Sequence, residues 1–446
     1  MKKRILSIAL TLLLALPILA LFSVASQAGS YPGALQFRPD HSFKIVVIAD
    51  IHAGVSVAAK TKQFMRTVLR TEQPDLIVLT GDNIYGTGSA ANSRTAVREV
   101  MDTLAPFGIP VAPVFGNHDA EGAAASQRAQ VGYYNAYGFS LMGSESGTDE
   151  AGNYNLLIRS SDGANPRAFN LWMLEARTYG GWYSVGARTQ SWMKAKNDAL
   201  KTENGGSLVP SMVFKHIVPT KIRDFLAEEC GGRTNWQAYN TSKWGNTVNS
   251  PENELNVMDE DPCPDENDNG EWAAYKAVGT LGVAFGHEHA NNFRARWDGI
   301  DLINCGQASS GDNKARVITL YEDRPNLSPD DIETRTVLYS ELSAAGELPP
   351  LEDILPNAPI TLYRKEQCQD LLDAAAANPG LTWRSSDPSV LCVDDDGTLT
   401  YQRAKLGKAT IEVYRGDDIL DTVQIEVQWQ WWQWVLVVAL FGWMYL

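Results

Sequence analysis

Side chains that bind metal ions recur in five short motifs of this sequence. The motifs are Asp50-Ile51-His52, Gly81-Asp82-Asn83, Gly116-Asn117-His118-Asp119, Lys215-His216-Ile217 and Gly286-His287-Glu288-His289. Imidazole nitrogens combined with carboxylate and amide oxygens form a ligand set that suits iron, manganese or zinc. A lone histidine usually has a structural role, but five of the six histidines in the chain fall in these motifs. The motifs offer seven candidate ligands, which is enough for two metal ions.

Two of the motifs repeat the same spacing of ligand-type residues. Asp50 and His52 alternate along an extended segment, so their side chains point to the same side and can hold one ion. His287 and His289 have the same spacing. Glu288, between them, is expected to face away from the metal and to have a structural role.

The motifs around Asp82 and Asn117 offer other kinds of ligand. The two carboxylate oxygens of Asp82 can bridge a pair of ions, and Asn117 contributes a neutral oxygen. His118 is then turned differently from Asn117. For Asp119 two roles stay open, because it can orient His118 through a hydrogen bond or cap the following helix. His41 precedes the first strand, and we assign it no function.

Each motif follows a run of residues that is typical of a buried strand. Strands are expected at 44–49, 76–80, 110–115, 170–174, 211–214, 282–285 and 301–304, and helices at 60–70 and 94–104. Such alternation permits sheets with helices packed outside, where ligands bind beyond the carboxyl ends of the strands. Glycines before Asp82, Asn117 and His287 allow tight turns at these ends.

Taken in order over roughly residues 43–320, the motifs D-x-H, G-D-N, G-N-H-D, a lone strand-end histidine and G-H-x-H resemble the calcineurin-like metallophosphoesterase superfamily. The segments Gly181-Trp182-Tyr183 and Gln190-Ser191-Trp192 resemble the exported branch related to purple acid phosphatases. His52 stands where purple acid phosphatases have glycine, although Tyr85 is kept, so a coloured tyrosinate-iron centre is not expected. The resemblance implies an α/β (α+β) four-layer sandwich with two central mixed β-sheets flanked by helices.

The resemblance also implies a role for each site residue. One ion is expected on Asp50, His52 and His289, the other on Asn117, His216 and His287, with Asp82 bridging them. His118 and Asp119 are the expected catalytic residues, and His118 stays free of metal and protonates the leaving group or steadies the phosphoryl oxygens. Two divalent or trivalent ions (Mn, Fe or Zn) polarise the phosphate and generate a bridging hydroxide. The expected reaction is hydrolysis of a small phosphomonoester, with a phosphodiester as the less favoured alternative.

The composition indicates a folded chain of more than one domain. Its 446 residues exceed the usual size of one domain, and 44% of them are apolar. The formal net charge of −15 argues against a nucleic-acid partner, because phosphate backbones are held by clustered lysine and arginine. Bound metal ions can still supply positive charge locally for a phosphate substrate.

Both ends of the chain carry segments typical of export and anchoring. Lys2, Lys3 and Arg4 precede an apolar run, and a small-residue cleavage site ends the expected signal peptide at residues 1–28. A retained N-terminal anchor is the alternative. The tail 429–446 starts with tryptophans and continues without charge, which favours a membrane anchor over a docked strand or helix. We therefore expect an extracellular or cell-surface protein.

Between these ends the sequence divides into two domains. A metallophosphoesterase domain is expected at 40–340, with a polar insertion at 219–272, and a Pro-rich linker at 341–359. Residues 360–427 predict a small all-β sandwich. Its segment Leu381–Val390 resembles bacterial Ig-like domains of group 2, which implies a spacer or adhesion unit in contact with the cell envelope. We favour the spacer.

The five cysteines favour two disulfide bridges, Cys230 with Cys263 and Cys368 with Cys392, with Cys305 left over. Two other functions remain open for the whole chain. A single-metal hydrolase such as a zinc amidase needs only three protein ligands. A surface adhesion or binding protein can carry an inert phosphoesterase domain. The complete ligand set argues against both.

Overall fold

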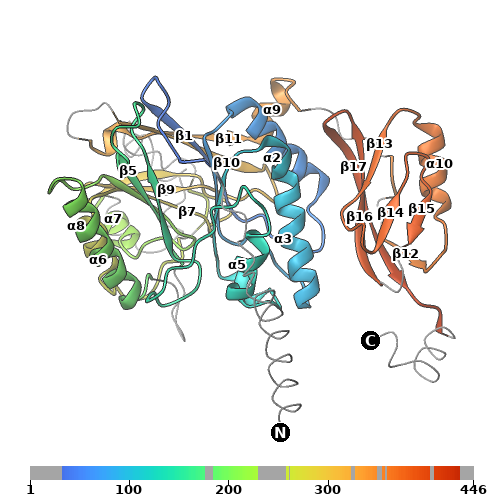
Figure 1. Cartoon of the computed structure of the whole chain (residues 1–446), viewed down its shortest axis with the longest axis horizontal. Helices are drawn as coiled ribbons and strands as arrows, with labels where there is room; N and C mark the ends of the chain where they lie inside the picture. Colours follow the sequence, from blue (N-terminus) through green and yellow to red (C-terminus); the bar gives the residue numbers. More distant parts are fainter. Residues whose placement is uncertain are drawn as a thin grey trace, which may run out of the picture.

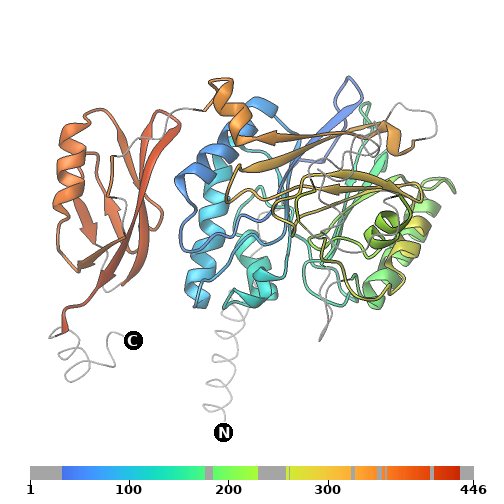
Figure 2. The same ribbon diagram turned by 180° about the vertical axis from the view of Figure 1, so that it is seen from behind.

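The computed structural model describes residues 33–175, 184–229, 258–260, 262–322, 327–348, 354–356, 359–401 and 406–431. These residues form a large α/β region and a smaller β-rich region at the C-terminal side, which lie next to each other in both views (Figure 1, Figure 2).

The first mixed sheet has five strands in the order β11-β10-β1-β2-β3. Its strands are β1 (Ser42–Ile48), β2 (Leu76–Thr80), β3 (Val111–Val114), β10 (Lys314–Tyr321) and β11 (Glu333–Leu338). Strands β1, β2 and β3 are parallel, and β10 pairs with β1 and β11 in antiparallel fashion. The carboxyl ends of β1, β2 and β3 therefore share one edge of the sheet.

The second mixed sheet has six strands in the order β4-β5-β6-β7-β9-β8. Its strands are β4 (Tyr154–Ile158), β5 (Phe169–Met173), β6 (Ser211–Phe214), β7 (Thr280–Phe285), β8 (Arg294–Trp297) and β9 (Ile300–Asn304). Strands β5, β6, β7 and β9 are parallel, whereas β4 and β8 close the two sides in antiparallel pairs.

Helices cover the outer faces of the two sheets (Figure 1). Helices α2 (Ala59–Glu72), α3 (Ala90–Leu104) and α5 (Gln127–Tyr134) lie on one side, and α6 (Ala187–Glu203), α7 (Ile222–Glu229) and α8 (Glu271–Ala277) on the other. The sheets share one hydrophobic core, to which Val46 of the first sheet and Leu171 and Ile303 of the second belong. The prediction of two mixed sheets with flanking helices is confirmed.

Short elements complete the α/β region. They are α4 (His118–Glu121), the 3₁₀ turns Ala105–Phe107 and Pro329–Asp331, and α9 (Tyr339–Ala344). Helix α9 lies at the start of the segment that was expected to be a linker, so residues 341–344 are helical instead. Helix α7 likewise lies inside the expected polar insertion. Residues 230–257 and 261 of that insertion are outside the described residues.

The C-terminal region contains two small sheets and a helix. Its strands are β12 (Ile360–Tyr363), β13 (Thr382–Ser385), β14 (Leu391–Val393), β15 (Leu399–Tyr401), β16 (Gly407–Arg415) and β17 (Asp418–Gln428). Helix α10 (Gln369–Ala377) packs Leu371 and Ala375 into the core around Trp383 and Ile411. The prediction of an all-β region was wrong in this respect, because α10 supplies part of the core.

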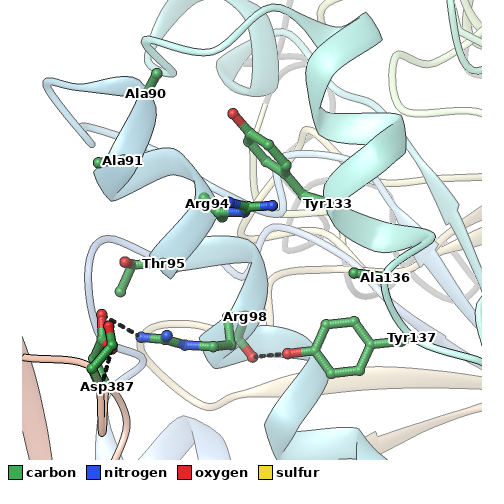
Figure 3. A pocket seen from close by; sticks show the side chains of 10 residues that line it. Ala90, Ala91, Arg94, Thr95, Arg98, Tyr133, Ala136, Tyr137 and Asp387 are labelled. Atoms are coloured by element: carbon green, nitrogen blue, oxygen red, sulfur yellow. Dashed lines mark hydrogen bonds and ion pairs between the residues drawn. The ribbon is translucent and has the colours of Figure 1, made fainter. Parts of the chain in front are cut away.

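The C-terminal region packs against α2 and α3 of the α/β region. Buried Lys62 on α2 donates a hydrogen bond to Glu99 on α3 (2.7 Å) and also contacts Glu412 on β16. A cavity of about 590 Å³ lies at the boundary between the two regions, where Arg98 approaches Asp387 at 3.2 Å (Figure 3). Charged side chains of both regions thus meet along this boundary.

The expected signal peptide and residues 432–446 of the tail lie outside the described residues. Within the described part of the chain, no helix has both the length and the apolar character needed to cross a bilayer. Cys368 is buried with a free thiol, so the expected bridge to Cys392 is not formed. Cys230 lies outside the described residues.

Candidate metal centre

The loops that follow β1, β2, β3, β6 and β7 meet at one place and bring the predicted ligands together. Three overlapping groups have ligand atoms within 4.8 Å of one another: Asp50 with His52 and His289, Asp82 with His216 and His287, and His52 with Asp82 and His118. The first two groups match the two predicted ion sites. The groups consist only of His, Cys, Asp and Glu residues, so they do not include Asn117.

The backbone at this edge adopts conformations that are rare for side-chain-bearing residues. Asp50, His52, Asp82 and His287 have positive φ angles of 54°, 49°, 49° and 73°. Such conformations cost of order 1–3 kcal/mol each and concentrate at functional sites. Four strained ligand positions at one edge therefore indicate that the fold holds these side chains for binding.

Each central carboxylate uses one oxygen for the backbone and directs the other at imidazoles. Asp82 Oδ1 accepts a hydrogen bond from His118 N at 2.7 Å, and Asp82 Oδ2 lies 3.1 Å from His216 Nε2. Asp50 Oδ2 accepts from His287 N at 3.1 Å, and Asp50 Oδ1 lies 3.3 Å from His289 Nε2. The backbone bonds fix both carboxylates and leave one oxygen of each facing the centre of the site.

Several buried polar atoms at this centre lack a hydrogen-bond partner among the described residues. They are Asp50 Oδ1, Asn117 Oδ1 and His216 Nε2. His216 Nδ1 lies 2.9 Å from the carbonyl oxygen of Thr80, which accepts its hydrogen and leaves Nε2 free to bind a cation. Unpartnered buried acceptors are costly, so this donor set fits metal ions.

The electrostatics of the protein chain alone also favour a cation here. Burial opposes charge on His216, but Asp82 and Asp50 outweigh it and raise the pKa of His216 to about 10. Burial, together with the neighbouring His216, lowers the pKa of His287 to about 4. One buried imidazolium therefore balances the carboxylates at neutral pH, and a metal ion can take over this charge.

His118 lies at the solvent side of the site. Its Nε2 is 3.8 Å from Asp82 Oδ2, and 30% of its side chain is exposed. The ring of Tyr85, which is 49% exposed, lies 4.4 Å from the His118 ring. His118 is thus close enough to the centre to touch a bound substrate, while its predicted freedom from metal stays a prediction.

Of the two roles that are open for Asp119, orienting His118 and capping the following helix, the first is not seen, because no hydrogen bond joins Asp119 to His118 Nδ1. The buried carboxylate of Asp119 accepts backbone hydrogen bonds from Gly116 (2.8 Å), Ile84 (3.0 Å) and Asn83 (3.3 Å). His118 Nδ1 has no hydrogen-bond partner among the described residues. Asp119 instead joins the loops after β2 and β3, and is a positioning residue. Burial and the charge of Asp82 raise the pKa of Asp119 to about 7.

Residues outside the predicted set also approach the ligands. Gln307 Nε2 lies 3.3 Å from His52 Nδ1, and Gln307 follows β9 just as the ligands follow their own strands. Extending the strand-end rule to β9 would have found it. Glu288 is buried and accepts from Cys263 N at 2.9 Å, in accord with a structural role. The segment 181–183 lies outside the described residues.

The chain is similar in sequence to several known proteins. The phosphatase DCR2 of Saccharomyces cerevisiae is 32% identical over 164 residues, which are 32% of this chain and 28% of that protein. "Probable inactive purple acid phosphatase 28" of Arabidopsis thaliana is 36% identical over 103 residues, 20% of this chain and 26% of that protein. The chain thus spans less than a third of the length of these two relatives.

Longer matches exist at lower identity. "Probable inactive purple acid phosphatase 14" of Arabidopsis thaliana is 26% identical over 320 residues, 61% of this chain and 72% of that protein. A dimetal phosphatase from Danio rerio covers 67% of this chain and 99% of its own, with 14% identity and a TM-score of 0.41. The family model described as "Calcineurin-like phosphoesterase" matches residues 43–306, which is more than half of the chain. The chain therefore belongs to the calcineurin-like phosphoesterase family and is a metallophosphoesterase.

Proposed function

We propose that this enzyme hydrolyses phosphomonoesters with two metal ions bound at the described centre. The position of Asp82 carries the proposal, because its Oδ2 lies 3.1 Å from His216 Nε2, 3.4 Å from His52 Nε2 and 3.8 Å from His118 Nε2. One carboxylate oxygen therefore faces ligands of both ion sites. Asp50, His52 and His289 would hold one ion, and Asn117, His216 and His287 the other.

The residues divide the chemical work. The ions held by these residues would polarise the phosphoryl oxygens and lower the pKa of water at the site. His118, exposed beside this centre, donates a proton to the departing oxygen, a role that contributes about 100-fold to 10,000-fold in rate. Asp119 fixes the backbone from which His118 projects. Manganese, iron and zinc all suit the mixed ligand set.

A phosphomonoester is favoured over a diester as the substrate. The relatives named above are called phosphatases, which supports a small phosphorylated substrate. Two Arabidopsis relatives are named as probably inactive, so an inert surface protein is the alternative function. Convergence of the ligands on one centre, with three of their atoms buried and without a hydrogen-bond partner in the described chain, argues for activity here.

Hydrolysis of p-nitrophenyl phosphate and of its bis-ester by the purified protein tests this function. We expect turnover that requires manganese, zinc or iron, prefers the monoester, and is abolished in Asp82→Asn. His118→Ala should lower kcat by about 100-fold or more. His41→Ala is a matched control, since His41 lies away from the site beside Glu322. Absence of turnover with every metal, in a folded protein, would favour the inert alternative.

We further propose that the enzyme acts outside the cytoplasm on a membrane surface. The basic and apolar start of the chain supports export, and the Trp-rich tail supports an anchor. The C-terminal region, with its resemblance to Ig-like domains, would lie between the enzyme and this anchor. Cell fractionation of the full chain beside a chain ending at residue 428 checks the anchor, since only the full chain should pellet with membranes.

A further inference from the structure

The last part of the polar insertion returns to the metal centre and contacts the loop that carries His289. Glu260 belongs to this returning segment. Its Oε1 accepts a hydrogen bond from His289 N at 2.7 Å, and its Oε2 accepts from Ala290 N at 3.0 Å. Both carboxylate oxygens of Glu260 therefore hold the backbone at and beside a predicted metal ligand.

The loop holds the insertion in return, through the buried side chain of Asn291. Asn291 Oδ1 accepts hydrogen bonds from Asp259 N at 2.7 Å and Glu260 N at 2.9 Å. Asn291 Nδ2 donates to the carbonyl oxygen of Glu260 at 3.0 Å. These reciprocal bonds fix the position of Glu260 relative to the loop, so its carboxylate is presented in one orientation.

Lys314 binds the backbone of the same two residues through their carbonyl oxygens. Its Nζ donates to the carbonyl oxygens of His289 at 3.1 Å and Ala290 at 3.2 Å. Gly306 has a φ of 67°, and a Cβ there would lie 2.5 Å from Lys314 Cδ. It would also lie 2.7 Å from the carbonyl oxygen of Asn291, so a side chain at position 306 would crowd both Lys314 and the backbone of the loop. Glu260 and Lys314 together leave the backbone of His289 little freedom.

The hydrogen bonds that join Glu260 and Lys314 to the backbone of residues 289 and 290 form a clamp. This clamp matters more for His289 than for His216 and His287. His289 has 40% of its side chain exposed, whereas His216 has 1% exposed and is held by packing. His287 is held by Asp50, which accepts its backbone N–H. The direction of the His289 ring toward Asp50 thus depends on contacts made by its backbone, and half of those come from the insertion.

We propose that Glu260 is a positioning residue of the metal centre, and that it makes occupancy of the Asp50, His52 and His289 site depend on residues 258–260 of the polar insertion. The inference rests on the proposed function, because it requires two ion sites. Without the clamp, the His289 ring should lose its fixed orientation. His216 and His287 keep the contacts that hold them, so their site should be unaffected. Removing a contact that orients a metal ligand typically weakens binding by about 10-fold to 100-fold.

Zinc titration of the metal-free full-length protein, in competition with a chromophoric chelator, tests the proposal. We expect two equivalents in the wild type. Glu260→Gln should keep one site at wild-type affinity and weaken the other by about 10-fold to 100-fold. Lys314→Met, which acts on the carbonyl side, should weaken the same single site. Glu266→Gln is the matched control, because Glu266 is exposed on the same insertion and the substitution is identical.

The outcomes separate this inference from the proposed function. Fewer than two equivalents in the wild type would reject the two-ion centre itself. Two unchanged sites in both Glu260→Gln and Lys314→Met would reject the positioning role. Equal weakening of both sites, together with a lower unfolding temperature of the metal-free variants, would also reject it, since that pattern indicates a general loss of structure. If Glu260→Gln does not fold, Lys314→Met decides.

Discussion

The charge on His216 depends on its two carboxylate neighbours. Because Asp82 and Asp50 raise the pKa of His216 to about 10, the ring is protonated at pH 7.5 in the metal-free protein. A ligating imidazole must be neutral, so metal binding should release about one proton from this residue. Calorimetric titration with zinc at pH 7.5, in two buffers of different ionisation enthalpy, measures the number released.

Because metal binding releases a proton, the metal affinity should depend on pH. Between pH 7 and 9 the affinity should rise about tenfold per pH unit for the site that uses His216. His216→Gln should release about one proton fewer, with His41→Gln as the matched control. If His216→Gln and the wild type release the same number of protons on metal binding, His216 is not protonated in the metal-free protein.

The raised pKa also predicts how the metal-free fold responds to pH. A histidine whose pKa is higher in the folded state stabilises the fold fully below its unfolded value of about 6.5. This contribution is lost as the pH rises through about 10, the folded value. The metal-free protein should therefore lose stability over this window, and the metal-loaded protein should not show this loss.

At the scale of elements, the turns after the strands bring the ligands together. Some of these turns need glycine because a Cβ would clash with neighbouring atoms. A Cβ on Gly116 would lie 2.3 Å from Asp82 Oδ1 and 2.4 Å from Asp82 N. The backbone nitrogen cannot move away like a flexible side chain. Gly116→Ala should thus displace Asp82, destabilise the fold by about 1–3 kcal/mol, and reduce the metal content.

Gly132 is the matched control for this substitution. It lies within helix α5, and a Cβ there would meet no atom within 4 Å. Gly132→Ala should stabilise the protein by about 0.5–1 kcal/mol, because alanine loses less conformational freedom in a helix. Unfolding in denaturant and metal analysis of both variants check the pair. Similar stability and metal content in the two variants would contradict the role given to Gly116.

Sequence patterns predicted the buried parallel strands well, because such strands are nearly continuous apolar runs. The strands at 76–80 and 211–214 have the expected bounds, and the helix expected at 94–104 begins earlier, where Ser89 caps it by accepting from Asn92 N. Strands β4, β8, β10 and β11, which all form antiparallel pairs, were not predicted. The edge strands β8 and β11 carry charged residues, such as Arg296 and Glu333, so their apolar signal is weak.

The candidate site was predictable where metal-binding residues come directly after a strand. Asp50, Asp82 and His216 converge because parallel strands of both sheets end at the same place. The role of Asp119 was not predictable, since its partners are backbone N–H groups that no motif specifies. Glu260 was missed because its contact with His289 joins two segments 29 residues apart, and no motif specifies this contact.

At the scale of the whole molecule, the C-terminal region is docked on the enzyme through a buried charge cluster. Burial opposes charge on Lys62, but Glu99 and Glu412 outweigh it and raise the pKa of Lys62 above its ordinary value. The Lys62 side chain is 3% exposed and that of Glu99 1%. Lys62→Met would leave the buried Glu99 and the half-buried Glu412 without this counter-charge, and should destabilise the protein by about 3–5 kcal/mol.

Arg70 provides the matched control on the same face of α2. It pairs with Asp418 of the C-terminal region, but the two side chains are 45% and 33% exposed. Exposed pairs contribute at most about 1 kcal/mol, so Arg70→Met should have a small effect in the same denaturant experiment. Equal losses in Lys62→Met and Arg70→Met would contradict the importance of burial at this boundary.

Glu412→Gln separates docking from the stability of the enzyme region itself. Lys62 keeps its hydrogen bond to Glu99 in this variant, so the α/β region retains its own pair and only the contact across the boundary weakens. If docking depends on this contact, the C-terminal region should unfold before the α/β region, and limited proteolysis should cut faster between residues 345 and 360. A single unchanged transition would mean that the other contacts, such as Arg98 with Asp387, hold the two regions together without Glu412.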